Sequence, residues 1–498
     1  MNILLLSMPD SFEHMPSIVI RMPNGALSSL AGNLDAHHRV AIADLVLVQN
    51  RVRATLERLV RELAPDVVGL SIMTFQRKTA KQIIRLVRKL RPSVRIVVGG
   101  YDPSLAPEAY SSMGEEAVDF IIKSEGEQTF AKLLRALEGG GGYEAVAGVS
   151  YAAEEGFRHN APPPAQRLDG DDLHLPNRKA RILRGYTMVG RQVDVVETSR
   201  GCTFDCSFCS IIEMRGRNFH TFPLERVIED IRDARGHGAR AIFLVDDNIT
   251  LNVSRFEALC EAIIKAGLSD LEYYVQAMTS AIASHGAHLA PLMRRAGFRY
   301  VFLGIENMDE QNLKFLHAAA KNTGREDGRA AGNASLKAIE FLHQHGMYVV
   351  GGLIVGNPND TAQSIQANLD MARRYVDWPY IQHPTPYPRT PMRQEFAQRG
   401  LIEHDRVEEY DGTTAVVRTE HLSGAEVEFL RWQAERWIKL KHFPVVLRHN
   451  PGFVLRHART MLEHTFRGCQ LKTWLGLEDE REAFRRYRAL REQERTYL

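Results

Sequence analysis

Short apolar runs alternate with amphipathic segments over the first 145 residues. The apolar runs occupy residues 2–6, 40–47, 66–73, 95–100 and 119–124. Between the last three, apolar residues recur at helical spacing in residues 79–91 and 104–114. Continuous hydrophobic strands that alternate with helices are typical of a parallel sheet buried on both faces. The pattern therefore predicts a doubly wound, Rossmann-like α/β domain over residues 1–145, with ligands bound beyond the carboxyl ends of its strands.

The same alternation returns at residue 193, after a polar connector that we predict over residues 146–190. Six further apolar runs are separated by helical patterns, and they occupy residues 193–199, 241–245, 272–276, 300–305, 347–356 and 380–384. Six such units in succession predict a partial (β/α)6 barrel of the TIM type over residues 191–394, whose active site lies at the C-terminal ends of the strands. Residues 395–498 have no strand signal and indicate a helical C-terminal region.

Composition places the chain among soluble globular proteins. It has 498 residues, of which 44% are hydrophobic and 25% charged, and its net charge is +2. This balance gives no reason to expect nucleic acid as a partner. The start of the chain has no basic leader, and no stretch has the roughly 20 apolar residues of a membrane span. We therefore expect a cytoplasmic protein, in which thiols stay reduced and clustered cysteines indicate metal binding or catalysis.

Three of the five cysteines lie within eight residues, directly after the first predicted barrel strand. Cys202, Cys206 and Cys209 follow the spacing C-x3-C-x2-C. A structural zinc site is normally closed by four protein ligands, whereas three thiolates on an iron–sulfur cluster leave one iron open. The alternative is a zinc knuckle completed by a distant histidine. The other two cysteines, Cys260 and Cys469, are expected to be packing residues.

Residues 202–209, CTFDCSFC, resemble the signature of the radical S-adenosylmethionine (SAM) superfamily, with Phe208 as the aromatic residue before the last cysteine. The resemblance implies that the three cysteines bind a 4Fe-4S cluster. It further implies that SAM chelates the open iron, and that an electron from the cluster releases a 5′-deoxyadenosyl radical.

Polar or glycine-bearing segments at later strand ends extend this resemblance. Residues 244–248, 302–307 and 351–358 resemble segments that hold the amino group, ribose and adenosine of SAM, and glycines permit such close approach of backbone to a ligand. Residues 385–391 resemble the turn after the sixth strand, although Arg389 stands where a glycine is usual. The SAM-binding residues implied in this way are Phe208, Asp246, Asp247, Asn248, Glu306, Gly352 and Gly356.

The first domain resembles the corrin-binding domains of cobalamin enzymes. The resemblance rests on Ser71 within residues 68–74, on the pair Gly99-Gly100 after a strand, and on residues 124–129. The cobalamin-binding residues that it implies are Ser71, Met73, Thr74, Phe75, Gly99, Gly100, Tyr101, Glu125 and Gly126. The Asp-x-His-x-x-Gly loop of histidine-on cobalamin proteins is missing. We therefore expect residues 73–77 beneath the cobalt, and His37 and His38 as solvated turn residues.

A cobalamin domain fused to a radical barrel is the arrangement of cobalamin-dependent radical SAM methyltransferases. The resemblance implies methylation of an unactivated carbon through methylcobalamin and a 5′-deoxyadenosyl radical. One alternative is a cyclase or oxidase without methyl transfer, as in the anaerobic porphyrin cyclase; another is a non-catalytic corrin or iron–sulfur sensor. Since both cofactors would serve one reaction, we expect one shared cavity, with Asp246, Asp247, Glu306 and Gly99-Gly100 around its wall.

The substrate is left open as a small molecule, lipid, tetrapyrrole or peptide. A flavodoxin or ferredoxin is the expected electron donor. Residues 429–466 mix Trp432, Trp437 and Phe443 with several lysines and arginines. Basic amphipathic helices of this kind can lie on a membrane surface, although a helical cap packed on the barrel would explain the same pattern.

Overall fold

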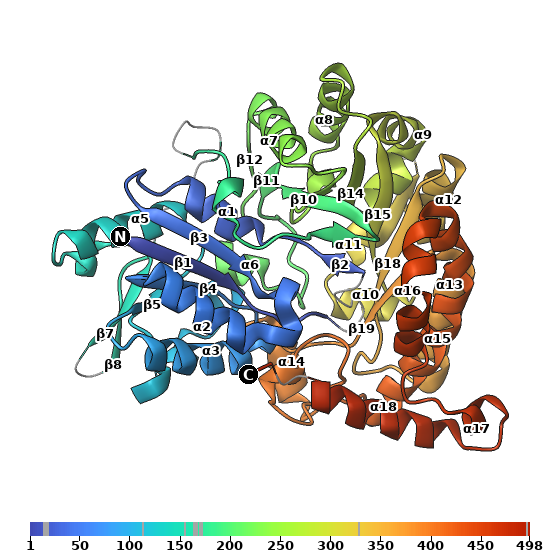
Figure 1. The fold of residues 1–498 in the computed structure, drawn as a ribbon. Helices are drawn as coiled ribbons and strands as arrows, with labels where there is room; N and C mark the ends of the chain where they lie inside the picture. Colours follow the sequence, from blue (N-terminus) through green and yellow to red (C-terminus); the bar gives the residue numbers. More distant parts are fainter. Residues whose placement is uncertain are drawn as a thin grey trace.

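The computed structural model describes the 498-residue chain apart from residues 13–18, 112–113, 154–155, 163–167, 169–172, 327–328 and 495–496. Its two main sheets lie side by side (Figure 1), the first built from the N-terminal third of the chain and the second mostly from residues 187–382. Helices flank both sheets, and the C-terminal helices pack beside the second.

The first sheet has the order β3-β1-β4-β5-β6-β7-β8. Its parallel strands are β1 (Asn2–Ser7), β3 (Arg39–Asp44), β4 (Val67–Ser71), β5 (Arg95–Gly99) and β6 (Phe120–Ile122). Leu4 and Leu6 of β1 share a core with helices α2 (Val52–Leu63) and α3 (Arg77–Leu90). Ile3 and Leu5 point to the other face, where α1 (Gly25–Gly32) and α5 (Glu127–Glu138) cover the sheet. The predicted doubly wound fold is confirmed.

The residues predicted as a connector have structure of their own. Strands β7 (Val149–Ala153) and β8 (Gly156–His159) are antiparallel and extend the first sheet beyond residue 145. Residues 154–155, 163–167 and 169–172 of the connector, including two of its three clustered prolines, lie outside the described residues. The helical pattern over residues 104–114 gives only the short helix α4 (Tyr101–Leu105) and 3-10 turns.

The second sheet forms the predicted partial barrel. Its six parallel strands are, in order, β10 (Arg191–Val196), β13 (Ala241–Leu244), β14 (Glu272–Met278), β15 (Phe298–Glu306), β18 (Tyr348–Ile354) and β19 (Trp378–Gln382). The helices that connect them share one continuous core with the strands. They are α7 (Leu224–Gly236), α8 (Val253–Lys265), α9 (Thr279–Ala296), α12 (Ser335–Gln344) and α13 (Ala362–Tyr375). Cys260 lies in that core, fully buried, as expected for a packing residue.

Two short strands tie the N-terminal part of the chain to the barrel. β9 (Thr187–Met188) pairs antiparallel with β10, and β2 (Ile20–Arg21) pairs with β9. The smaller elements of the barrel loops are α6 (Ile211–Arg215), α10 (Glu310–Phe315), α11 (Ala319–Asn322), β11 (Ser199–Arg200), β12 (His220–Thr221), β16 (Thr323–Glu326) and β17 (Arg329–Asn333).

The C-terminal region is helical and packs on the barrel. Its helices are α14 (Pro391–Gln398), α15 (Gly424–His449), α16 (Pro451–Thr465), α17 (Leu471–Trp474) and α18 (Glu480–Glu494). Val427 and Ile438 of α15 belong to the barrel core. Among the described residues, no helix is both long and apolar enough to cross a membrane.

Candidate cofactor site between the two sheets

A cavity of about 390 Å³ lies between the first domain and the barrel. The first domain lines it with the ends of β4 and β5, helix α1 and the turn before α5. The barrel lines it with residues after β10 and with the end of α6. The predicted residues that the structure brings together around this cavity are Ser71, Met73, Gly99, Gly100, Tyr101, Glu125, Gly126 and Asp247.

Gly100 shapes the turn between β5 and α4. Its φ of +98° and ψ of −162° place it in a backbone region that is essentially restricted to glycine. A Cβ added there would stand 3.0 Å from the backbone nitrogen and oxygen of Ile72. Ser71, at the end of the neighbouring strand, accepts a hydrogen bond from Asn24 Nδ2 at 3.2 Å. The turn can therefore pass close to Ser71 only because residue 100 has no side chain.

An apolar recess extends this cavity between the first sheet and helices α1 and α5. Leu5, Leu27, Leu30 and Phe130 line it. Gly69 also lines it, and a Cβ on Gly69 would lie 2.8 Å from Leu5 Cδ2. A recess with apolar walls and a hydroxyl at its mouth suits an aromatic group with a polar edge, such as the nucleotide tail of cobalamin. The residues present fit this cofactor.

Arg200 joins the two domains beneath the cavity. Its guanidinium is buried and donates to Glu127 Oε1 of the first domain at 2.6 Å and to Glu197 Oε2 of the barrel at 2.8 Å. Burial alone would raise the pKa of Glu127, but Arg200 and a hydrogen bond from Ser29 lower it to about 2. Glu127 is therefore a carboxylate at neutral pH, and its ion pair with Arg200 links the first domain to the barrel.

Asp246 and Asp247 follow β13 but point into different surroundings. Asp247 lines the cavity, accepts a hydrogen bond from the Gly201 backbone at 2.8 Å and lies 3.4 Å from Arg215 Nη1. Asp246 is buried and accepts hydrogen bonds from the backbone and hydroxyl of Thr198 and from Ser199 Oγ. Burial raises the pKa of Asp246 to about 7 despite these donors. These hydrogen bonds occupy the Asp246 carboxyl and hold the backbone at Thr198 and Ser199 in place, directly before the cysteine loop.

Ser207 anchors the cysteine loop, residues 202–209, to two distant segments. Its backbone N–H and its hydroxyl donate to the carbonyl oxygens of Leu316 and Phe315, each at 3.0 Å, and its carbonyl accepts from Met392. Burial raises the pKa of Cys206, and raises that of Cys209 to about 12. Such thiols lose their protons readily only when a metal supplies positive charge, as the irons of a cluster do.

Tyr101 links this loop to the cobalamin domain. Burial raises the pKa of Tyr101, and the charges of Asp247 and Cys209 raise it further. Those charges act on Tyr101 because the first turn of α4 lies against α6, which directly follows the cysteines. Ser124 Oγ also donates to the Met214 carbonyl of α6 at 2.6 Å. The corrin side and the cluster side of the site therefore face each other.

The arrangement of the thiols argues against a zinc knuckle. Two thiolates on one zinc, each about 2.3 Å from it, lie at most about 4.6 Å apart. Among the described residues, the group of three metal-ligating side chains whose atoms lie within 4.8 Å of one another is His37, His38 and Glu138, not the three cysteines. The three cysteine sulfurs are therefore not all within 4.8 Å of one another, whereas ligands of one zinc ion would be.

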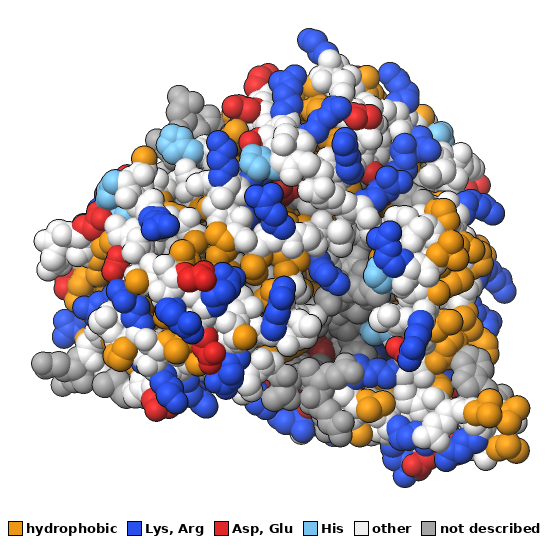
Figure 2. All heavy atoms as spheres, viewed as in Figure 1, with side chains coloured by type: hydrophobic (Ala, Val, Ile, Leu, Met, Phe, Trp, Pro, Cys, Tyr) orange, Lys and Arg blue, Asp and Glu red, His pale blue; other side chains and the backbone are white. Residues whose placement is uncertain are grey.

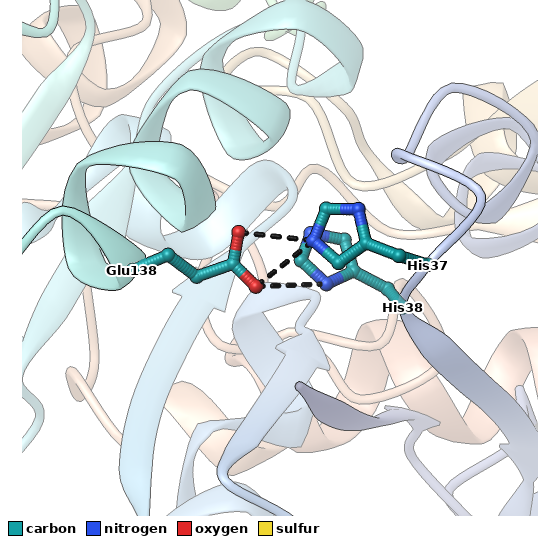
Figure 3. A group of neighbouring side chains, drawn as sticks. All are labelled: His37, His38 and Glu138. Atoms are coloured by element: carbon teal, nitrogen blue, oxygen red, sulfur yellow. Dashed lines mark hydrogen bonds and ion pairs between the residues drawn. The ribbon is translucent and has the colours of Figure 1, made fainter.

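Figure 3 shows that the rings of the two histidines lie beside the Glu138 carboxylate. Burial lowers the pKa of His38, which favours its neutral form. The carboxylate lies 3.0 Å from His37 Nε2 and 3.5 Å from His38 Nδ1. His37 is exposed, but His38 is only 8% exposed, so the expectation that both are solvated was wrong for His38. They precede β3, at the N-terminal edge of a parallel sheet whose C-terminal edge holds Ser71 and Gly99. They therefore lie at the edge of the sheet opposite the cavity.

Two of the residues implied to bind SAM lie by the cysteine loop. Glu306, with a φ of +59°, ends β15 and pairs with Lys321 Nζ at 2.5 Å. The same ammonium stands 5.2 Å above the Phe208 ring. A non-glycine residue held at positive φ is a strained position that often occurs at functional sites.

Other implied residues are placed differently. Asn248 Nδ2 lies 3.8 Å from Cys202 Sγ, next to the cluster position. A Cβ added to Gly352 would clash with the Phe302 side chain, and one added to Gly356 would clash with the Val427 side chain. The lack of a side chain at these two glycines therefore leaves room for neighbouring residues of the barrel. Several predicted residues do not line the described cavity: Cys202, Cys206, Cys209, Thr74, Phe75, Phe208, Asp246, Asn248, Glu306, Gly352 and Gly356. The expected wall was therefore right for Asp247, Gly99 and Gly100 and wrong for Asp246 and Glu306, whose carboxyls are taken up by Thr198 and Ser199 and by Lys321.

Sequence reasoning missed several residues of the cavity wall, namely Asn24, Glu197, Arg200, Met214 and Arg215. Arg200 could have been noticed, because a buried strand-end arginine two residues before Cys202 requires an acidic partner. The others carry no local signal, since their partners are far away in the chain.

Two protein-family models match the chain. The model of the Radical SAM superfamily matches residues 196–372, and the model of the B12 binding domain matches residues 18–134. A protein of Pyrococcus horikoshii named as an uncharacterised methyltransferase, PH0819, is 26% identical over 92% of this chain and 97% of its own length. The anaerobic magnesium-protoporphyrin IX monomethyl ester cyclase of Rubrivivax gelatinosus is 26% identical over 81% and 71%. The hopanoid C-3 methylase of Methylococcus capsulatus is 28% identical over 71% and 65%.

The fold is shared with a solved structure. The radical SAM methyltransferase TsrM from Kitasatospora setae, with cobalamin and a [4Fe-4S] cluster bound, superposes with a TM-score of 0.64 at 18% identity. The match covers 86% of this chain and 85% of that one. Together with the two matched domains, the cavity between them and the clustered cysteines, this identifies the chain as a cobalamin-dependent radical SAM enzyme.

Proposed function

We propose that this enzyme transfers a methyl group to an unactivated carbon of a small organic substrate that enters the cavity between the domains. The observation that carries the proposal is that one cavity is lined both by the corrin-side residues Ser71 and Gly100 and by the barrel residue Asp247. A radical formed at the cluster must meet its target hydrogen near van der Waals contact, so a shared space is what such a transfer needs.

The residues of this chain bind and orient the groups that react. Cys202, Cys206 and Cys209 would hold the 4Fe-4S cluster, and Ser71 with Gly99-Gly100 would hold cobalamin. When bound, the cluster supplies the electron that cleaves SAM, and cobalamin carries the methyl group. Asp247 offers a carboxylate to the cavity, where Arg215 keeps it paired. Arg200 and Glu127 hold the two walls in register.

The relatives do not narrow the choice of substrate. Their names include a methylase of hopanoids and a methyltransferase of cytidylyl-2-hydroxyethylphosphonate, which are chemically different molecules. A flavodoxin or ferredoxin is proposed as the electron donor, and no nucleic acid partner is proposed.

A cyclase without methyl transfer is the second candidate, because three relatives are named as anaerobic magnesium-protoporphyrin IX monomethyl ester cyclases. Transfer of label distinguishes the two without knowledge of the substrate. Reconstituted holoenzyme would be reduced anaerobically and given SAM with a deuterated methyl group. Methyl transfer predicts label in the corrinoid fraction, together with S-adenosylhomocysteine and 5′-deoxyadenosine. Formation of 5′-deoxyadenosine with an unlabelled corrinoid would favour the cyclase, and formation of neither would indicate a sensor.

A further inference from the structure

Exposed large hydrophobic side chains are concentrated in one part of the C-terminal region. Of the twelve in the described residues, seven lie between residues 437 and 477: Trp437, Leu447, Leu455, Leu462, Leu471, Leu475 and Leu477. Three of these, Leu455, Leu471 and Leu477, are 75–76% exposed. We call these seven residues the C-terminal apolar patch. Scattered exposed leucines need no explanation, but such a concentration indicates an interaction surface.

The same segment is strongly basic. Residues 436–477 contain eight lysines and arginines and a single acid, Glu463, whereas the whole chain has a net charge of only +2. Arg448 and Arg456 are exposed beside leucines of the patch, Leu447 and Leu455. The remainder of the chain is therefore net negative. Within the segment, Arg436 is buried, and four of the basic side chains have acidic partners: Arg436 with Glu480, Lys439 with Glu435, Arg459 with Glu463 and Lys472 with Glu478. Positive charge at the exposed apolar surface comes foremost from Arg448 and Arg456.

The two faces of α16 show why packing on the barrel does not account for the patch. Phe453 and Val454 are buried in a cluster with residues of the barrel strands. Leu455 and Leu462, seven residues apart, point to the opposite side together with Arg459. Helix α17 and the turn after it add Leu471, Leu475 and Leu477. Packing of the C-terminal helices on the barrel therefore accounts for the buried face of this region, whereas the leucines on its other face are exposed to solvent.

Figure 2 shows this surface from outside. Hydrophobic side chains gather over α17 at the lower right, and others follow the right edge beside the C-terminal helices, with Lys and Arg between them. An apolar surface interspersed with basic side chains is complementary to an anionic bilayer, which offers acyl chains beneath negative headgroups. A second copy of this chain would bring the same positive charges together, so charge disfavours self-association here.

We propose that α16, α17 and the exposed side of α15 dock this enzyme on the surface of an anionic lipid bilayer. The leucines enter the boundary between headgroups and acyl chains, and the arginines and lysines lie at the headgroup level. The docking is peripheral and does not depend on which substrate the enzyme methylates.

Vesicle co-sedimentation with the reconstituted holoenzyme tests the proposal. Phosphatidylcholine vesicles containing phosphatidylglycerol should bind the enzyme, and pure phosphatidylcholine vesicles or high salt should bind it at least about tenfold less. Leu471→Asp combined with Leu477→Asp should lower binding to the anionic vesicles by a similar factor. Leu90→Asp is the matched control, because Leu90 is also exposed and has basic neighbours but lies on α3 of the first domain. This control should bind as the wild type does.

Unchanged iron and cobalamin content of each variant would show that its fold is intact. The proposal is overturned if wild-type enzyme does not bind anionic vesicles at low salt, or if Leu90→Asp weakens binding as much as the double change. It is also overturned if light scattering shows a dimer that the Leu471→Asp and Leu477→Asp changes dissociate, because a second copy would then cover the patch. None of these readouts uses methyl transfer, so the outcome is independent of the proposed function.

Discussion

At the residue scale, the surroundings of a side chain decide its role more than its identity does. Asp246 and Asp247 are adjacent, yet the first is enclosed by Thr198 and Ser199 while the second faces the cavity. The same contrast separates the cysteines, since Cys260 is fully buried in the barrel core while Cys202, Cys206 and Cys209 lie in one loop at its mouth.

Replacing any one of Cys202, Cys206 or Cys209 by Ala should remove most of the bound iron and abolish cleavage of SAM, because each thiolate is a full ligand of the cluster. Iron analysis and 5′-deoxyadenosine formation after anaerobic reconstitution would measure this. Cys260→Ala and Cys469→Ala are the controls, and both should retain wild-type iron. Full iron and activity in a variant lacking all three loop cysteines would disprove the cluster assignment.

Glu127→Gln should destabilise the protein by about 3 kcal/mol at neutral pH, because the pKa of Glu127 falls from 4.5 to about 2 on folding. A depressed pKa contributes stability that is fully present above about pH 4.5 and is lost as the pH falls towards 2. The difference in unfolding free energy between wild type and variant, measured by chemical denaturation, should therefore shrink as the pH falls from about 4.5 towards 2. Glu144→Gln, in an exposed turn, should show no such difference. A difference in unfolding free energy that stays constant down to pH 2 would contradict the role of the Arg200–Glu127 ion pair.

At the scale of elements, the parallel strands of both sheets could be predicted from the hydrophobic runs, and the cysteine loop from the spacing of its three cysteines. The pattern did not reveal β7 and β8, because these strands are short and only partly buried. It also did not reveal the pairing of β2 with β9, since that contact joins residues more than 160 positions apart. The Arg200–Glu127 pair was missed for the same reason, because local pattern carries no information on distant partners.

The turn between β5 and α4 should tolerate no side chain at residue 100. In Gly100→Ala the Cβ would meet Ile72 backbone at 3.0 Å, so the turn must move away from Ser71. We expect cobalamin affinity to fall at least about tenfold, which corresponds to about 1.4 kcal/mol. Gly140→Ala is the control, because Gly140 also has positive φ but no atom within 4 Å of the added Cβ. Equal affinities for both variants, measured by spectral titration, would show that the turn does not bind the corrin.

The N-terminal edge of the first sheet should play no part in cobalt ligation. His37→Ala and His38→Ala should leave the cob(II)alamin electron paramagnetic resonance spectrum unchanged, because both histidines precede β3 and pair with Glu138 at the far edge. Nitrogen superhyperfine splitting from a protein imidazole that disappears in either variant would refute this placement.

At the scale of the whole molecule, the two domains are joined by several direct contacts and not only by the connecting segment of the chain. β2 pairs with β9 at the edge of the barrel sheet, Ser124 donates to Met214, and Arg200 pairs with Glu127. These contacts come from three separate places around the cavity, so its two walls are fixed relative to each other. Rigid walls suit chemistry in which two cofactors must meet one substrate carbon.

Binding of cobalamin should therefore protect barrel residues as well as the first domain from hydrogen exchange. If the corrin occupies the cavity, the backbone amides around residues 198–201 and 214–216 should exchange more slowly when cobalamin is added to protein that already holds its cluster. Residues 98–105 should be protected in parallel, since Gly100 and Tyr101 form the opposite wall. Helix α17 serves as the internal control and should not change, because it lies far from the cavity in the C-terminal region (Figure 1). Protection confined to the first domain would mean that the corrin does not reach the barrel. The two cofactors would then lack a common space, and methyl transfer between them would lose its structural basis.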